Sequence, residues 1–293
     1  MKKNLLKTLF AGAFLSMLFP LTASADVEIN ETNFPDEYFR NYLLEQDYGQ
    51  DGIITDEEIA GITSINVFAR GLSSLKGIEY FMALTSLSCS DNQLTSLDVS
   101  RNTALTKLQC ERNQLTSLDV SKNTALTFLL CSYNQLTSLD VSNNTALENL
   151  YCYGNQLTSL DVSNTALKYM GCYLNQIKGA SMDALIKGLP INESSMEYQL
   201  FIYTTSTLIG NDGNVCTRSQ IADIKAKGWT PYYSSDLRFW FLYEGNDDDL
   251  SSIAKPIIGT ENANTPVYNL SGQKVANVKK GIYIVNGHKV VIK

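Results

Sequence analysis

Apolar and polar positions follow one recurring phrase through the middle of the chain, from Leu84 to Gln176. The phrase is LTSLxCxxNQLTSLDVSxNTA, and its cysteines step by 21 residues and finally by 20: Cys89, Cys110, Cys131, Cys152 and Cys172. A leucine-rich phrase of this period is typical of a solenoid, in which each unit holds one short strand and a return segment. Stacked units share one core. We therefore predict a leucine-rich-repeat solenoid with a parallel β concave face and an irregular or short-helical convex face.

The cysteine and asparagine columns of the phrase are predicted to be structural. Leu87 and Cys89 lie two positions apart, so both point inward from the same strand. Asn92 and its equivalents follow the strand and can satisfy backbone groups of neighbouring coils. Strands about 4.8 Å apart with parallel side chains do not give the converging Cβ atoms that a disulfide needs. A line of thiols without histidine also does not give a tetrahedral metal site. We expect buried, reduced thiols.

The phrase, with cysteine in a leucine position and LDVSxNT on the return, closely resembles the repeats of the internalins, a family of bacterial surface adhesins. This resemblance covers about a third of the chain. It implies a role in recognising a protein at the bacterial surface, although a shared fold is weak evidence about the partner.

The N-terminus is typical of an export signal. Three lysines precede an apolar run from Leu9 to Leu21 and an Ala-Ser-Ala cleavage site, so residues 1–25 are predicted to be a signal peptide. Cleavage would leave 20 basic against 30 acidic residues, a net charge of −10. This charge argues against nucleic acid as a partner. No later apolar run reaches the roughly 18 residues of a membrane span. We expect a secreted or cell-surface protein (outer-membrane exterior), not membrane-spanning, and a monomer.

Residues 26–61 are predicted to form a helical cap over the first coil, in which Phe34 to Gln46 has helical spacing. The segment DYGQDGIITDEE then fits a loop of the EF-hand type, and the internalins have a shortened cap of this kind. Its candidate Ca²⁺ ligands are Asp47, Asp51, the Ile53 carbonyl, Thr55 and Glu58. Gly49 stands where a carboxylate or amide is usual, so only weak Ca²⁺ binding is expected, and Gly49→Asp should tighten it. The alternative is a cap without an ion.

The repeats are expected to span residues 62–176, with enlarged coils carrying helices and strands over 177–243. The enlarged part is predicted to hold a helix at 182–190, a second helix that begins at an N-cap Thr217, and a strand at 229–233. A polar linker follows at 244–265. Residues 266–293 are predicted to form a small β-module, and YNLSGQKV and KGIYIVNG resemble the type IX secretion sorting domain of exported Bacteroidetes proteins. The alternative is a module that only covers the end of the solenoid.

Little in the sequence indicates catalysis. The single histidine, His288, lies in the C-terminal β-module, so no histidine-dependent triad is available on the solenoid. The repeated aspartates occupy one turn column, which favours turn capping: Asp98, Asp119, Asp140 and Asp161. We predict a protein that is not an enzyme and has no certain cofactor. The alternative from another class is a secreted hydrolase that works with paired carboxylates.

The positions that vary between repeats flank the inward leucine and cysteine, so they face outward on the predicted concave surface, here called the strand face. Early coils carry small and charged residues there, such as Ser88, Lys107, Glu111 and Arg112. Later coils carry a mostly aromatic set, predicted to cluster and to bind a ligand: Phe128, Leu130, Tyr133, Tyr151, Tyr153, Tyr169 and Tyr173. The sequence thus predicts an adhesin-like protein that binds a protein or glycan. One alternative is a protein that captures glycans. Another is a surface on which these positions vary without a function.

Overall fold

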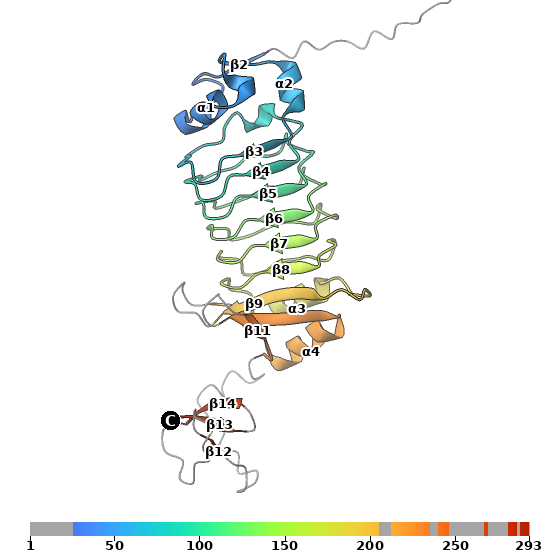
Figure 1. Ribbon diagram of the computed structural model, residues 1–293. Helices are drawn as coiled ribbons and strands as arrows, with labels where there is room; N and C mark the ends of the chain where they lie inside the picture. The colour runs from blue at the N-terminus through green and yellow to red at the C-terminus, as the bar shows by residue number, and fades with distance from the viewer. Residues whose placement is uncertain are drawn as a thin grey trace, which may run out of the picture.

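The computed structural model describes residues 26–204, 212–234 and 240–245, together with strands at 267–268, 281–285 and 288–292. Figure 1 shows short strands stacked in one ladder, with a helical cap at one end and further helices at the other. Nine strands form this sheet, in the order β11-β10-β9-β8-β7-β6-β5-β4-β3. All neighbours are parallel except β11, which is antiparallel to β10. The fold is a leucine-rich-repeat solenoid, as the sequence predicts.

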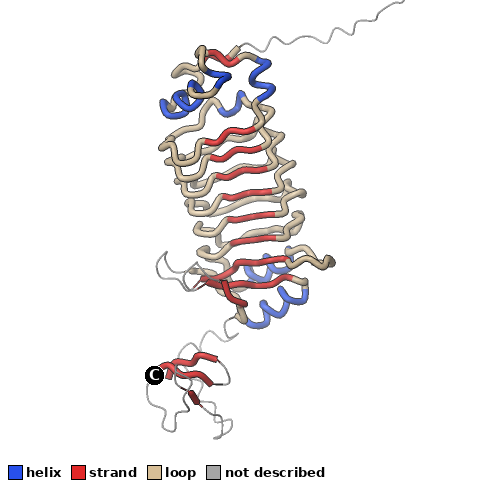
Figure 2. Tube along the Cα trace, viewed as in Figure 1, coloured by secondary structure: helices blue, strands red, loops and turns tan. Residues whose placement is uncertain are grey.

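The strands of the regular coils are three residues long and keep the sequence period: β3 (Ser64–Asn66), β4 (Ser86–Ser88), β5 (Lys107–Gln109), β6 (Phe128–Leu130), β7 (Asn149–Tyr151) and β8 (Tyr169–Gly171). In each of them only the middle side chain points to the core, and Leu87, Leu108 and Leu129 lie in register. From β4 to β8 the segments between consecutive strands are loop, shown in tan in Figure 2. A coil this short buries its apolar face only against its neighbours, so the core is continuous along the stack.

The N-terminal cap contains β1 (Val27–Glu28), α1 (Glu37–Leu44), the 3-10 helix η1 (Asp47–Gly49), β2 (Ile53–Ile54) and α2 (Asp56–Gly61), and a second 3-10 helix, η2 (Ile78–Tyr80), lies in the first coil. Phe34 is fully buried and packs against Phe39 and Phe81. Asp36 joins the cap to the first coil, because its carboxylate accepts hydrogen bonds from the backbone of Phe39, Ser73 and Ser74. Burial alone would raise the pKa of Asp36, but these hydrogen bonds outweigh it and lower that pKa.

The C-terminal coils are enlarged and contain α3 (Ala180–Gly188), β9 (Tyr198–Thr204), α4 (Arg218–Ala226), β10 (Trp229–Ser234) and β11 (Trp240–Leu242). The sequence prediction of a helix capped by Thr217 is confirmed, because the Thr217 hydroxyl accepts from the Gln220 N–H in a capping box. Helix α3 begins two residues earlier than predicted, after Gly179. The strands β12 (Val267–Tyr268), β13 (Gly281–Val285) and β14 (His288–Ile292) form a separate three-stranded antiparallel sheet. The predicted signal peptide and residues 246–266 lie outside the described residues.

A ladder of asparagine side chains ties each coil to the one before it. Asn134 Nδ2 donates to the carbonyl oxygens of Cys110 and Cys131 at 3.0 and 3.1 Å, and Asn134 Oδ1 accepts from the Leu115 N–H at 3.0 Å. Asn92, Asn113, Asn155 and Asn175 repeat this arrangement, which confirms the predicted role of the column. Asn214 extends it into the enlarged coils, because Asn214 Oδ1 accepts from the Ile177 N–H.

A second asparagine ladder was not predicted from the sequence. Asn102, Asn123 and Asn144, in the NTA turn, are fully buried, and each Nδ2 donates to two carbonyl oxygens of the preceding coil. The two ladders lie on different sides of the coil, one after the strand and one on the return. They satisfy buried backbone carbonyls that have no partner in a regular helix or sheet.

The cysteines are free and buried, and the five of the repeat column are fully buried. The predicted column of unpaired thiols is therefore confirmed. Burial raises the pKa of Cys89 and Cys152 to about 12, so these thiols stay protonated at neutral pH.

Labelling with a thiol-reactive dye is expected to find almost no reactive cysteine in the native protein and all six after denaturation. Cys131→Ala should lower the free energy of unfolding by roughly 1–2 kcal/mol, because it leaves a small cavity in the stack. An intact mass that shows disulfides would contradict this account of the column.

Candidate ligand-binding face

The predicted aromatic cluster lies on three neighbouring strands and on the turns that follow them. Phe128, Leu130, Tyr151 and Tyr169 belong to β6, β7 and β8, and Tyr133, Tyr153 and Tyr173 lie two or three residues beyond the strand ends. The register places Phe128 beside Asn149, and Asn149 beside Tyr169. Tyr151 lies between Leu130 and Gly171. Consecutive strands are about 4.8 Å apart, so the set spans roughly 10 Å across the sheet.

The rings contact one another from coil to coil, as the sequence predicts. The ring centroids of Phe128 and Tyr151 are 5.7 Å apart. The ring centroids of Tyr153 and Tyr133 are 5.2 Å apart, and the two rings meet edge to face with their planes at 85°. Tyr153 also stacks on Tyr173, with ring centroids 4.4 Å apart and planes at 8°. Tyr169 lies close enough to Tyr151 to contribute to the raised pKa of Tyr151, whose main cause is burial. One continuous aromatic surface therefore covers the later coils.

Two glycines make room for these rings, and the sequence analysis did not single them out. A Cβ atom at Gly154 would lie 2.6 Å from the Tyr133 ring. A Cβ atom at Gly171 would lie 3.1 Å from the ring of Tyr151 and 3.2 Å from that of Tyr153. The tyrosine rings of one coil thus lie over a glycine of the next coil, which has no side chain to block them. This packing fixes the rings before any ligand arrives, which reduces the entropy lost on binding.

The aromatic surface is less exposed than the outward strand positions predict. The side chains of Phe128, Leu130, Tyr133, Tyr151, Tyr153 and Tyr169 are half-buried, and Tyr173 is only 6% exposed. Tyr173 was named as a contact residue, but its buried ring lies against Tyr153 and can act on a ligand only through that neighbour. Burial is also the main cause of the raised pKa of Tyr173. The rings available to a ligand are those of the other aromatic members of the set.

Aromatic residues continue beyond the predicted set into the enlarged coils. Phe201 lies in register with Gly171 and stacks on Tyr232 at 5.4 Å. Tyr203 stacks on Tyr243 at 5.3 Å. These residues were missed because the enlarged coils break the 21-residue period, so sequence spacing alone does not assign them to the strand face.

Two basic side chains of the earlier coil lie on rings of the aromatic cluster. Lys107 Nζ is 5.3 Å from the ring centroid of Phe128, and the Arg112 guanidinium carbon is 4.7 Å from that of Tyr133. Arg112 Nε also lies 4.0 Å from a carboxylate oxygen of Asp91. The aromatic cluster and the charged earlier coil therefore form one surface, which already accommodates cations on its ring faces.

The repeated aspartates act as turn caps. Oδ1 of Asp98, for example, accepts from the Ser100 N–H at 2.9 Å, and Asp119, Asp140 and Asp161 make the same contact with the serine two residues on. The backbone hydrogen bond is the main cause of the lowered pKa of each of these aspartates. A glycoside hydrolase that works with paired carboxylates needs one carboxyl group with a raised pKa as its acid, and the pKa values of this aspartate column are lowered.

The loop predicted to bind Ca²⁺ uses several of its oxygen atoms for local contacts. Glu58 Oε2 accepts from the Thr55 N–H and hydroxyl at 2.9 and 2.8 Å, in a capping box at the start of α2. Asp51 Oδ1 accepts from the Ile53 N–H, and Asp47 Oδ1 accepts from the Gln50 side chain at 3.4 Å. In the part of the chain that the structure describes, no group of three or more His, Cys, Asp or Glu side chains could hold a metal ion. Weak Ca²⁺ binding stays a prediction.

Calorimetry is expected to give a dissociation constant for Ca²⁺ near the millimolar range of extracellular modules, because Glu58 must leave its capping box to bind. Micromolar affinity, or no binding at several millimolar, would contradict this. The expectation that Gly49→Asp tightens binding is wrong, because a Cβ atom at Gly49 would lie 2.1 Å from the Leu43 carbonyl oxygen. That substitution should instead disrupt the cap.

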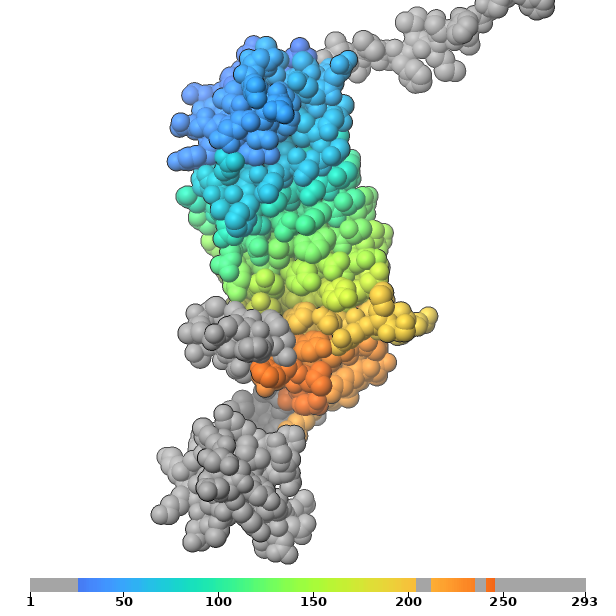
Figure 3. All heavy atoms as spheres, viewed as in Figure 1, coloured from blue at the N-terminus to red at the C-terminus, as the bar shows by residue number. Residues whose placement is uncertain are grey.

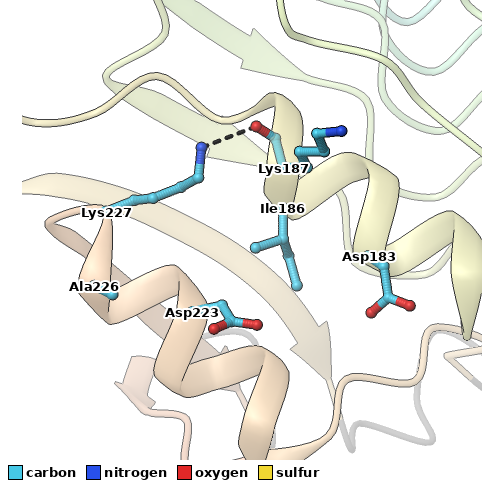
Figure 4. Close-up of a pocket in the computed structure, with 6 residues that line it drawn as sticks. All are labelled: Asp183, Ile186, Lys187, Asp223, Ala226 and Lys227. Carbon is cyan, nitrogen blue, oxygen red and sulfur yellow. Dashed lines mark hydrogen bonds between the residues drawn. The ribbon is translucent and has the colours of Figure 1, made fainter.

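A depression between α3 and α4 offers no comparable site. It is lined by Asp183, Ile186, Lys187, Asp223, Ala226 and Lys227 (Figure 4). Lys227 Nζ donates to the carbonyl oxygens of Lys187 and Leu189 at 2.9 and 2.7 Å, and thereby caps the end of α3. Asp183 accepts from the Gln220 side chain at 2.6 Å. These contacts join the two helices, so the polar groups of the depression serve the fold.

Comparisons with known proteins agree with the fold. No protein-family model matches the chain. Over 71 residues, 24% of the chain, the sequence is 41% identical to internalin J of Listeria monocytogenes serotype 4b (strain F2365). The chain spans only 8% of the length of that relative. The resemblance to an internalin is therefore supported over about a quarter of the chain.

Solved structures extend the similarity beyond the repeats. The functional domain of internalin J from Listeria monocytogenes, which includes a cysteine ladder, matches 72% of this chain and 48% of its own, with 28% identity and a TM-score of 0.52. Internalin C2 of the same species matches 73% of this chain and 92% of its own, with 20% identity and a TM-score of 0.55, and this likeness shows the fold alone. In the described part of the chain, no helix has the length and apolar character to cross a membrane.

Proposed function

We propose that this protein is exported to the bacterial surface or medium and binds a protein partner through its strand face. The observation that supports this most is the aromatic cluster of β6 to β8, whose half-buried rings are fixed by Gly154 and Gly171. Rigid aromatic side chains at the centre of a surface are the residues that most often dominate binding energy. The charged side chains of the preceding coil, Lys107, Glu111 and Arg112, supply a polar rim. The internalin-like cysteine column agrees with such a role.

The two ends of the chain are proposed to determine where the protein is found. Residues 1–25 would direct export, and residues 266–293 would act as a sorting segment or cover the end of the solenoid. We propose a monomeric chain that is not an enzyme, because the repeated carboxylates cap turns. Mass spectrometry of the secreted protein would test the N-terminal assignment, because retention of residues 1–25 would contradict export by a cleaved signal.

Photo-crosslinking tests the binding face. A photoreactive amino acid is placed either at Tyr151, on the strand face, or at Lys122, which is exposed on the return segment. Both full-length proteins are incubated with biotin-labelled surface proteins and, in parallel, with a glycan array. The proposal predicts a defined protein adduct from position 151 only. An adduct from position 122 alone would move the site to the other side of the solenoid, and binding to glycans without a protein adduct would favour glycan capture.

A further inference from the structure

Glu111 is the most unusual charged group on the strand face. Its side chain is half-buried, and burial is the main cause of its raised pKa; Asp91 adds to this effect and Arg112 opposes it. Within the described residues, the carboxylate of Glu111 accepts no hydrogen bond and forms no ion pair, whereas Arg112 lies beside Asp91. A partly desolvated carboxylate without an ion pair costs folding stability, and groups of this kind cluster at sites that bind a ligand.

The neighbours of Glu111 on the adjacent coils are two small, buried serines. The backbone ladder places Glu111 between Ser90 and Ser132, because the Asp91 N–H donates to the Glu111 carbonyl and the Arg112 N–H donates to the Ser132 carbonyl. Ser90 Oγ and Ser132 Oγ are buried and have no hydrogen-bond partner of good geometry. Ser132 Oγ lies near enough to the Tyr153 hydroxyl to lower its pKa, without making a well-formed hydrogen bond. The Glu111 carboxylate also lies close enough to the rings of Tyr133 and Tyr153 to add to their raised pKa values, whose main cause is burial.

The groups beyond Ser132 are aromatic. Tyr153 follows Ser132 in the same column, because the Tyr133 N–H donates to the Tyr153 carbonyl one coil further on. Tyr133 carries the Arg112 guanidinium on its ring at 4.7 Å. This contact shows, within one chain, how the surface receives a cation: a ring face on one side and a carboxylate on the other. Arg112 forms its ion pair with Asp91, whereas Glu111 feels the charge of Arg112 but forms no ion pair within the described residues.

We propose that Glu111, together with Tyr133 and Tyr153, receives a lysine or arginine side chain of the protein partner. The cation would neutralise the Glu111 carboxylate. The cost of removing the cation from water would be offset by its attraction to the faces of the tyrosine rings. The net charge of −7 favours a basic partner surface and would increase its association rate. This inference rests on the proposed function, because it names the chemistry of the partner at the same face.

The test uses small probes that differ only in charge. N-acetyl-L-arginine amide and its neutral citrulline isostere are titrated into the full-length protein, and the ring resonances of Tyr133 and Tyr153 are followed by NMR. The arginine probe should produce saturable shifts, and the citrulline probe should not. Glu111→Gln should weaken the arginine probe at least tenfold. Glu148→Gln is the matched control, because Glu148 is already paired with Lys168 at 2.6 Å, and it should leave the affinity unchanged.

The pH dependence and the folding of the variant give independent checks. Protonation removes the charge that binds the cation, so affinity should fall as the pH drops through the raised pKa of Glu111, above the ordinary glutamate value of 4.5. Glu111→Gln should not lower the thermal midpoint, because it removes an unpaired carboxylate. A structural role would lower that midpoint.

Other outcomes would overturn the inference. Equal binding of the citrulline probe, equal losses in Glu111→Gln and Glu148→Gln, or a methyl glycoside that shifts the same rings while the arginine probe does not would each contradict a cation site. A crosslinked partner that binds Glu111→Gln as tightly as the wild type would refute the cation site and leave the proposed binding face intact. If photo-crosslinking from position 151 gives no protein adduct, the proposed binding face itself is refuted.

Discussion

Replacement of Asn134 by alanine is expected to lower the free energy of unfolding by about 3 kcal/mol or more. The Asn134 side chain donates to the carbonyl oxygens of Cys110 and Cys131 and accepts from the Leu115 N–H, and all of these contacts are buried. Alanine leaves the Leu115 N–H and the carbonyls without these partners, and each buried polar group without a partner costs about 1–3 kcal/mol. The loss lies in the middle of the stack, so both neighbouring coils are affected.

Urea denaturation of the full-length protein measures this change, and Gln135→Ala provides the control. Gln135 follows Asn134 in the chain, but its side chain is exposed. A surface substitution of this kind changes stability by less than about 0.5 kcal/mol. An Asn134→Ala variant no less stable than Gln135→Ala would show that the ladder is not what holds the coils together.

Tyr151→Ala is expected to weaken binding of the protein partner by about 2 kcal/mol or more, roughly 30-fold in the dissociation constant. The ring of Tyr151 lies over Gly171 and contacts Phe128 at 5.7 Å, so it offers a fixed apolar area at the centre of the strand face. Its removal should cost folding stability little, because the ring is half-buried at the surface. Tyr153→Ala should also weaken binding, but Tyr153 packs on Tyr173, so part of its effect would come from the fold.

Titration of the immobilised partner with each variant measures the effect, and Lys122→Ala is the matched control on the return segment. Lys122 is exposed and lies outside the strand face, so its loss should leave the affinity unchanged. If Tyr151→Ala binds as tightly as the wild type while Lys122→Ala binds more weakly, the aromatic cluster is not the binding site.

The periodic part of the fold could be predicted because each repeated residue has one structural role. The spacing of Leu87 and Cys89 indicated the inward strand positions, and the asparagine column indicated a polar ladder, which Asn134 shows in full. The second ladder was missed because NTA looks like an ordinary polar turn. Only the stacked coil shows that the Asn123 side chain reaches the Val99 and Asn102 carbonyls.

The candidate site was predicted only in outline. The outward positions follow from strand alternation, so the sequence could place the tyrosines on one face. It could not show how far each ring is covered, because this depends on neighbours about 20 residues away. Tyr173 is buried under such contacts, and Gly171 makes room for the neighbouring rings because it has no Cβ atom. The unpaired state of Glu111 is likewise visible only when its coil neighbours are known.

Binding of the partner at the strand face can be tested in one measurement, because the strands and the return segments lie in different peptides of the chain. Figure 3 shows the solenoid in space-filling form as one continuous column from the cap to the enlarged coils. Hydrogen–deuterium exchange is measured on the full-length protein, free and saturated with the partner identified by crosslinking at position 151. Our account predicts new protection in peptides that contain β6, β7 and β8, with unchanged exchange in the return segments around Lys122 and Asn143. Protection confined to the return segments or to the cap would contradict it.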